Sequence, residues 1–147
     1  MWYKNKILSM TLLTIGIIVG TQSSALAECD QSKVTGTWNA NTYFFASDGL
    51  NHWLYCRLKV DNNGNINPST SVCNYDFGGE SLFPRSRFRI YKNCTMQPVD
   101  LDFFDSNGVY QFTSRINAAS TNRGQNVIQG AGDGGTNFPF TLTATKR

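Results

Sequence analysis

The chain has 147 residues, with 13 Lys and Arg against 10 Asp and Glu, so its formal net charge is only +3. This weak charge does not indicate a nucleic-acid partner, which a strongly basic patch would suggest. The sequence contains no Gly-x-Ser-x-Gly motif, no phosphate-binding glycine loop and no closely spaced cysteine pair for zinc. We therefore expect neither catalytic residues nor a cofactor or metal.

Residues 1–27 are predicted to form a secretory signal peptide that is removed before Glu28. Its apolar run is shorter than the roughly 20 residues of a membrane-spanning helix, so we expect no transmembrane segment. The features behind this prediction are the charges of Lys4 and Lys6, the apolar run over 7–19 and the small residues of Ala25-Leu26-Ala27.

The remaining residues, 28–147, are predicted to form one domain that a bacterium exports to the periplasm or to the exterior. A lipid anchor on Cys29 is the alternative, but Glu28 occupies the position where lipidation requires a small residue. Loss of Lys4 and Lys6 with the signal peptide lowers the formal charge from +3 to near +1.

Four cysteines remain after cleavage, and an even number in an exported chain predicts two disulfides. Cys56 and Cys73 flank a turn signal over 61–65, so they can meet across one hairpin, which leaves Cys29 for Cys94. Three connectivities are open, and we favour this one. Closing the loop from Cys56 to Cys73 would stabilise the fold by about 3 kcal/mol if disulfides act on chain entropy.

Strand-forming residues and period-two alternation predict antiparallel strands over 34–46, 52–60 and 65–74. Asn63-Gly64 predicts a hairpin turn, and Pro68 predicts an edge or a bulge in the third of these strands. The alternation is clearest in 52–60, where Leu54, Cys56, Leu58 and Val60 share one face and Trp53, Tyr55, Arg57 and Lys59 share the other.

The stretch 83–117 is predicted to form an antiparallel meander with turns at Cys94-Thr95 and at 105–108, so that one face is apolar and the other charged. The register for this arrangement pairs Arg87 with Asp102, Arg89 with Asp100, Phe88 with Leu101 and Ile90 with Val99. Beyond the second turn, Phe103 and Leu101 would face Tyr110 and Phe112.

The last part of the chain is predicted to contain a polar link over 117–125, a short strand over 126–131, a turn at 133–135 and a strand over 138–145. With the central meander, this gives about eight strands and no convincing helix. We predict an all-β fold, an antiparallel meander that closes into a small disulfide-stabilised β-barrel, because closure removes exposed strand edges.

His52 is the only histidine in the sequence. Because the sequence shows no carboxylate or thiol partner for it, we interpret it as incidental rather than catalytic. Asp100 and Asp102 are interpreted as cross-strand partners of arginines, in preference to a calcium site or an acid–base pair that also includes Asp105.

The segment Val34-Thr35-Gly36-Thr37-Trp38 resembles the Gly-x-Trp opening of the first strand in calycin-type barrels, the lipocalins and avidins. Together with 56–60 and Cys73 it is also similar to the periplasmic inhibitors of bacterial metalloproteases, which are eight-stranded barrels with one disulfide. The resemblance covers residues 34–73. This chain departs from the inhibitors in having four cysteines, and a bond at Cys29 would tether the N-terminal segment that they present to the protease.

The calycin resemblance implies a non-enzymatic binding protein that holds a small hydrophobic molecule inside its barrel. The cavity would be lined by Trp38, Phe88, Leu101, Phe103, Phe112 and Phe140. The alternative is a protein-binding module, either a secreted protease inhibitor or a surface protein that contacts a host, which uses exposed aromatic side chains. That surface would comprise Phe44, Phe45, Trp53 and Tyr55, because consecutive Phe44 and Phe45 cannot both point inward from a regular strand.

Overall fold

The computed structural model describes residues 28–45, 49–76, 79, 81–134 and 138–147, so the predicted signal peptide lies outside it. Within these ranges, no helix has the length and apolar character needed to cross a bilayer. The elements are a 3-10 helix η1 (Gln31–Val34) and the strands β1 (Gly36–Phe45), β2 (Asn51–Val60), β3 (Asn65–Ile66), β4 (Val72–Tyr75), β5 (Phe83–Arg87), β6 (Thr95–Met96), β7 (Val99–Phe104), β8 (Tyr110–Thr121), β9 (Val127–Gly134) and β10 (Phe138–Lys146).

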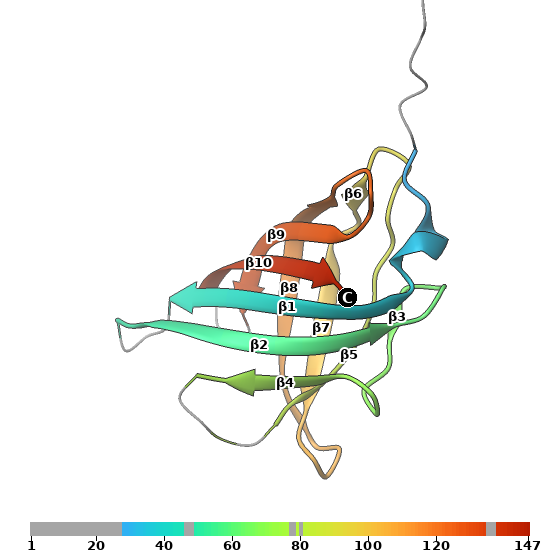
Figure 1. Ribbon diagram of the computed structural model, residues 1–147. Coiled ribbons are helices and arrows are strands. Elements are labelled where there is room, and N and C mark those ends of the chain that lie inside the picture. The colour runs from blue at the N-terminus through green and yellow to red at the C-terminus, as the bar shows by residue number, and fades with distance from the viewer. Residues whose placement is uncertain (1–27, 46–48, 77–78, 80, 135–137) are drawn as a thin grey trace, which may run out of the picture.

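The strands close into an eight-stranded antiparallel β-barrel (Figure 1). Their order around the barrel is β1-β10-β9-β8-β7-β5-β3-β2, and the pairing of β2 with β1 completes the ring. β4 also pairs with β2, so β3 and β4 together occupy one strand position of the barrel. β6 pairs with the C-terminal end of β8. Neighbours along the chain are neighbours in the barrel, as in an up-and-down meander. The predicted all-β barrel is confirmed.

Period-two alternation directs apolar side chains into the barrel. In β2 the buried and more exposed positions alternate as the sequence predicts, and the buried ones are Leu54, Cys56, Leu58 and Val60. β10 follows the same rule, with Phe140 and Ala144 buried. Each buried Leu, Val or Phe among them contributes roughly 1.5–3 kcal/mol when it is removed from water, so this inward face is the main source of stability.

Both predicted disulfides are present. Cys56 lies opposite Cys73 where β2 pairs with β4, and their sulfur atoms are bonded. Cys29 is bonded to Cys94, which lies 65 residues further along the chain. The first disulfide joins neighbouring strands, and the second fastens the N-terminal segment to the turn before β6.

The predicted register between β5 and β7 is wrong by two residues. Arg85, rather than Arg87, lies opposite Asp102. Asp100 forms its ion pair with Arg115 of β8, at 3.6 Å, and not with an arginine of the preceding strand. The charged face therefore exists, but its partners differ from those predicted.

The connection after β5 explains this shift. The chain turns over 91–94, where Cys94 adopts a φ of 70° and its N–H bonds to the carbonyl oxygen of Tyr91. Ile90 pairs with Met96 in an isolated bridge, and β6 then pairs with β8. The N–H of Tyr91 also bonds to the carbonyl oxygen of Thr95, and that of Gln97 to the carbonyl oxygen of Arg89, so the tight turn is centred earlier in the chain than the one predicted at Cys94-Thr95 and the pairing shifts with it.

Several predicted boundaries also differ. Residues 117–121 belong to β8 instead of a polar link, because they pair with β9, where the hydroxyl of Thr121 donates to the carbonyl oxygen of Val127 at 2.8 Å. β9 is longer than the strand predicted over 126–131 and includes Asp133 and Gly134 of the predicted turn, whereas Gly135 lies outside the described ranges. Pro68 does interrupt its strand, which divides into β3 and β4 as predicted.

Candidate functional site

One end of the barrel is closed by a cap, residues 29–34, which includes η1 (Figure 1). Val34 is completely buried, and its carbonyl oxygen accepts a hydrogen bond of 2.8 Å from the indole Nε1 of Trp38. Trp38 itself is only 1% exposed, so its ring lies inside the barrel beneath the cap. The cap and this ring fill the end of the barrel where β1 begins.

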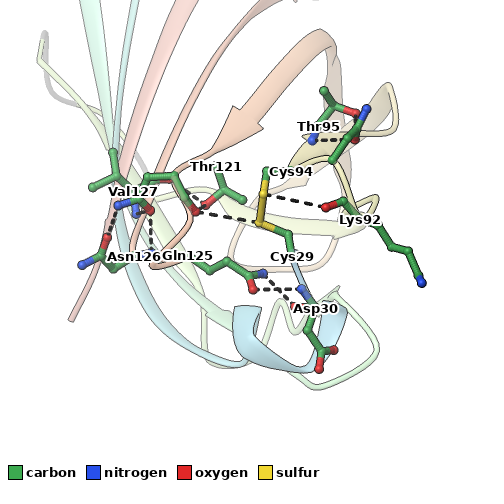
Figure 2. The surroundings of a disulfide bond; sticks show 11 residues. Cys29, Asp30, Lys92, Cys94, Thr95, Thr121, Gln125, Asn126 and Val127 are labelled. Atoms are coloured by element: carbon green, nitrogen blue, oxygen red, sulfur yellow. Dashed lines mark hydrogen bonds between the residues drawn. A yellow bond between two sulfur atoms is a disulfide. The ribbon is translucent and has the colours of Figure 1, made fainter. Parts of the chain in front are cut away.

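Two glutamine side chains hold the cap in position. Gln125 accepts a hydrogen bond from the N–H of Asp30 at 2.9 Å and donates one to its carbonyl oxygen at 2.7 Å, beside the disulfide of Cys29 (Figure 2). Gln31 accepts from the N–H of Ile90 at 2.8 Å and donates to the carbonyl oxygen of Phe88 at 3.3 Å. Each glutamine amide thus accepts a hydrogen bond from a backbone N–H and donates one to a backbone carbonyl oxygen, which satisfies these polar groups where they are buried.

The middle of the barrel contains only a small apolar void of about 60 Å³. Apolar voids of this kind remain dry, and typical ligand pockets are far larger, at roughly 300–1,000 Å³. The barrel interior is therefore nearly filled by its own side chains.

The opposite end opens into a larger space, the mouth cavity, of about 560 Å³. It lies where β1, β4 and β9 end and where β8 and β10 begin. Its lining comprises the aromatic residues Phe44, Tyr75, Tyr110, Phe112, Phe138 and Phe140, together with Thr42, Leu54, Gln111, Thr113, Ser114 and Gly134. Four of these residues also line the void and so form the floor of the mouth cavity: Thr42, Leu54, Ser114 and Phe140.

The aromatic walls are in contact from the rim to the core. The ring of Phe44 meets that of Tyr75 edge-on with centroids 6.4 Å apart, and Tyr75 lies 6.4 Å from Phe112. Phe112 is stacked on the buried Phe103 at 4.8 Å. Aromatic pairs at such separations attract each other beyond their burial, so these contacts stabilise the arrangement of the rings.

Among the residues that the structure describes, no charged side chain lines the mouth cavity. Burial raises the pKa of Tyr75 to about 12, so its phenol remains uncharged at neutral pH. A molecule in this cavity would therefore meet apolar ring faces and neutral polar groups.

Two carboxylates lie directly behind the polar rim of the cavity. The hydroxyl of Thr113 donates to Asp102 at 2.6 Å and lies 3.0 Å from the phenolic oxygen of Tyr110. The side-chain amide of Gln111 donates to Asp105 at 3.1 Å. The rim of β8 is thus hydrogen-bonded to negative charges on and after β7.

The six residues predicted to line a ligand cavity do not share one space. Those that line the small void are Trp38, Phe88, Leu101, Phe103 and Phe140, whereas Phe112 and Phe140 line the mouth cavity. Sequence reasoning missed the other rings of the mouth, Phe44, Tyr75, Tyr110 and Phe138. Alternation can show that a residue points inward, but it does not show at which end of the barrel space is left.

The residues predicted for protein contact lie on both sides of the barrel wall. Phe44 lines the mouth cavity, whereas Trp53 is 43% exposed and lies opposite Tyr43, which is 60% exposed. Tyr55 is half-buried two positions along β2 from Trp53, and the side chain of Phe45 lies outside the described residues. Tyr43 and Trp53 form an aromatic pair on the outer face that sequence reasoning found only in part.

His52 has a carboxylate neighbour that the sequence did not reveal. Its Nδ1 lies 3.4 Å from Asp76 Oδ1, and its ring centroid lies 5.7 Å from that of Phe44. Asp76 also accepts a hydrogen bond from the N–H of Trp53 at 3.2 Å, so it ties the start of β2 to the segment after β4. Because 24 residues separate His52 from Asp76, no local motif could have signalled the pair.

In the part of the chain that the structure describes, no three His, Cys, Asp or Glu side chains gather closely enough to hold a metal ion. No protein-family model matches the chain, and no curated protein or solved structure matches it significantly.

Proposed function

We propose that this is a non-enzymatic binding protein that holds a small hydrophobic molecule in the mouth cavity. The observation that carries the proposal is a space of about 560 Å³ whose lining, within the described part of the chain, includes six aromatic side chains and no charged one. Small-molecule sites are typically clefts of roughly 300–1,000 Å³ with mainly apolar walls and a few polar groups, and the mouth cavity has these properties.

The proposal keeps the function that the calycin resemblance implies, but it moves the ligand toward the rim. The void in the middle of the barrel is too small for a hydrophobic ligand, so the molecule would rest on the floor formed by Thr42, Leu54, Ser114 and Phe140. A calycin relationship is part of this proposal, and it is supported by the closed meander and by Gly36-Thr37-Trp38 at the start of β1.

The neutral probe N-phenyl-1-naphthylamine, whose fluorescence rises in apolar surroundings, tests the proposal. We expect saturable binding to the purified protein with its disulfides intact. Thr42→Phe adds a ring to the lining of the mouth cavity and is expected to weaken binding strongly, because the ring occupies the ligand's space.

Thr143→Phe is the matched control, since Thr143 is exposed and lies opposite Asn41 on the outer face. It adds the same ring outside the barrel and should leave binding unchanged. If Thr42→Phe binds the probe as tightly as the wild type does, the ligand site is not in the mouth cavity.

We also propose that the protein is exported to the periplasm or beyond after removal of residues 1–27. The two disulfides support this location, because disulfides persist in oxidising compartments and are rare in the cytosol. The sulfur of Cys29 is bonded to Cys94, so the same sulfur is not available for a lipid. The intact mass of the exported protein under non-reducing conditions tests both points, since cleavage before Glu28 and lipidation of Cys29 give different masses.

A second candidate function is protein binding through the outer aromatic pair of Tyr43 and Trp53. Large exposed rings on neighbouring strands often mark contact surfaces. A pull-down from secreted proteins with the double variant Tyr43→Ala and Trp53→Ala tests it. Tyr91→Ala is the control, because Tyr91 is similarly exposed, at 50%, but lies in the connection before β6. We expect the complex to be lost in the double variant and retained in the control. A complex that survives the double variant would exclude this surface.

A further inference from the structure

The hydrogen bonds at the rim of the mouth cavity determine which group donates and which accepts in each contact. Thr113 has one hydroxyl proton, and an ionised carboxylate can only accept, so Thr113 donates to Asp102 across 2.6 Å. The contact of 3.0 Å between Thr113 and Tyr110 must then be donated by the phenol. The Tyr110 hydroxyl has no proton left to donate and can offer a ligand only its lone pairs.

The side-chain amide of Gln111 likewise has no N–H left to donate to a ligand. Its side-chain NH₂ group donates to Asp105 at 3.1 Å and to the carbonyl oxygen of Val109 at 3.3 Å. Since an amide has two N–H donors, both are used, and only the amide oxygen remains for a ligand. The hydroxyls of Thr42 and Ser114, on the floor of the cavity, can either donate or accept.

The charges around this rim oppose an anion. Asp102 accepts a hydrogen bond from one lining residue, Thr113, and Asp105 accepts one from another, Gln111. One cation approaches the same network from outside, since the guanidinium of Arg85 lies 4.7 Å from the ring centroid of Phe104, which meets Tyr110 edge-on. Arg85 also lies opposite Asp102 in the strand pairing, so it offsets at most one of the two carboxylates.

We propose that the mouth cavity selects an uncharged or cationic ring compound that carries a hydroxyl or amine donor, and that it discriminates against anionic headgroups. This inference rests on the proposed ligand-binding function. The aromatic walls accommodate a ring, and aromatic faces also attract cations. Because the donors of Tyr110 and Gln111 are already used, only their oxygen atoms remain, and these accept a hydrogen bond from a donor on the ligand. The nearby carboxylates of Asp102 and Asp105 repel an anionic ligand.

Two probes with the same ring skeleton test the selectivity. N-phenyl-1-naphthylamine is neutral and has one N–H donor, whereas 8-anilinonaphthalene-1-sulfonate adds a single negative charge to the same rings. We expect the neutral probe to bind about tenfold more tightly or better at low salt, where one nearby charge has such an effect. Equal or tighter binding of the sulfonate would overturn the selectivity while leaving ligand binding intact. If neither probe binds, both the selectivity and the proposed function fail.

Two charge-neutralising variants test whether the carboxylate of Asp102 causes the preference for the neutral probe. Asp102→Asn removes the carboxylate behind Thr113 and should reduce the preference for the neutral probe by about threefold or more. Asp100→Asn removes an equal charge two residues away on β7, where Asp100 pairs with Arg115, and should leave the preference unchanged. Near-UV circular dichroism confirms that each variant is folded. An unchanged preference in Asp102→Asn, or an equal loss in both variants, would contradict the proposed role of this carboxylate.

Discussion

At Gly64 the backbone adopts a φ of +82°, and a Cβ atom there would lie 2.0 Å from the carbonyl oxygen of Phe88. The two segments are also joined by a hydrogen bond of 3.1 Å from the N–H of Phe88 to the carbonyl oxygen of Gly64. Glycine is therefore required here for two reasons, the left-handed conformation and the close approach of another chain segment. This single residue lets the hairpin turn after β2 pack against the connection that supports the cap.

Gly64→Ala is expected to be strongly destabilising. The left-handed conformation costs about 1–2 kcal/mol for a residue with a Cβ, and the clash with Phe88 adds about 1–3 kcal/mol. Gly108→Ala is the matched control, because Gly108 has a φ of +78° but open space around its Cβ position. Urea unfolding of both variants measures the difference, and equal losses would show that the clash relaxes without cost.

Asp61 makes the stability of the same turn depend on pH. The side-chain amide of Asn65 donates to its carboxylate at 2.7 Å, and this bond, with those from backbone N–H groups, lowers the pKa of Asp61 below its ordinary value of 3.8. The carboxylate is thus favoured in the folded state, so its contribution is present above pH 3.8 and is lost as the pH falls through the lowered pKa. Asp61→Asn should flatten the decline in unfolding free energy below pH 4, and a decline as steep as that of the wild type would exclude Asp61 as its source.

At the scale of elements, the cap shows how a segment with little hydrophobic surface is held in place. Only Cys29 and Val34 of residues 29–34 are buried. Besides the Cys29–Cys94 disulfide, hydrogen bonds hold the cap: Gln31 and Gln125 bond to backbone groups, and the ammonium group of Lys146 donates to the carbonyl oxygen of Lys33 at 2.7 Å. Gln125 is 1% exposed, so its two hydrogen bonds are made away from water, where an unpaired group is costly.

Gln125→Asn tests this attachment. Asparagine tolerates the positive φ of 51° at this position, but its shorter side chain cannot reach Asp30. We expect a loss of about 1–3 kcal/mol and faster amide hydrogen exchange at residues 30–35, because the N–H and carbonyl groups of Asp30 lose their hydrogen bonds to Gln125. Gln129→Asn, at an exposed position of β9, is the control. Unchanged exchange in the cap would mean that its other attachments hold it without Gln125.

At the scale of the whole molecule, the barrel is closed at one end and open at the other. Trp38, the cap and the Cys29–Cys94 disulfide occupy the first end, and the mouth cavity occupies the second. A domain of about 120 residues has a modest core, so a covalent link that closes a long loop is a large part of its stability.

Replacing Cys29 and Cys94 with serine is expected to lower the free energy of unfolding by about 4 kcal/mol in the chain-entropy description, because the closed loop is long. The corresponding value for the shorter loop between Cys56 and Cys73 is about 3 kcal/mol. Urea unfolding without reductant measures the loss in the double serine variant. A loss below about 1 kcal/mol would show that the unfolded chain gains little freedom from breaking this bond.

The sequence predicted what depends on neighbours along the chain. Alternation in 52–60 and 138–145 identified the inward faces, Pro68 marked the break between β3 and β4, and the turn at 105–108 was placed correctly. The register between β5 and β7 was not predictable in the same way. A turn centred earlier in the chain also preserves the alternation of faces, because a shift of two residues in the pairing returns each side chain to the same face.

The sequence by itself determined an antiparallel all-β fold, because strand alternation and turn residues are local signals, and it favoured closure into a barrel with two disulfides. Only the tertiary structure decided where a ligand could fit. The six predicted cavity residues all belong to the inward face, yet five of them surround a void of about 60 Å³, and the space of about 560 Å³ lies at the rim. The volume left inside a barrel depends on how side chains from all strands fill it together and on which end the cap closes, and no single strand encodes either property.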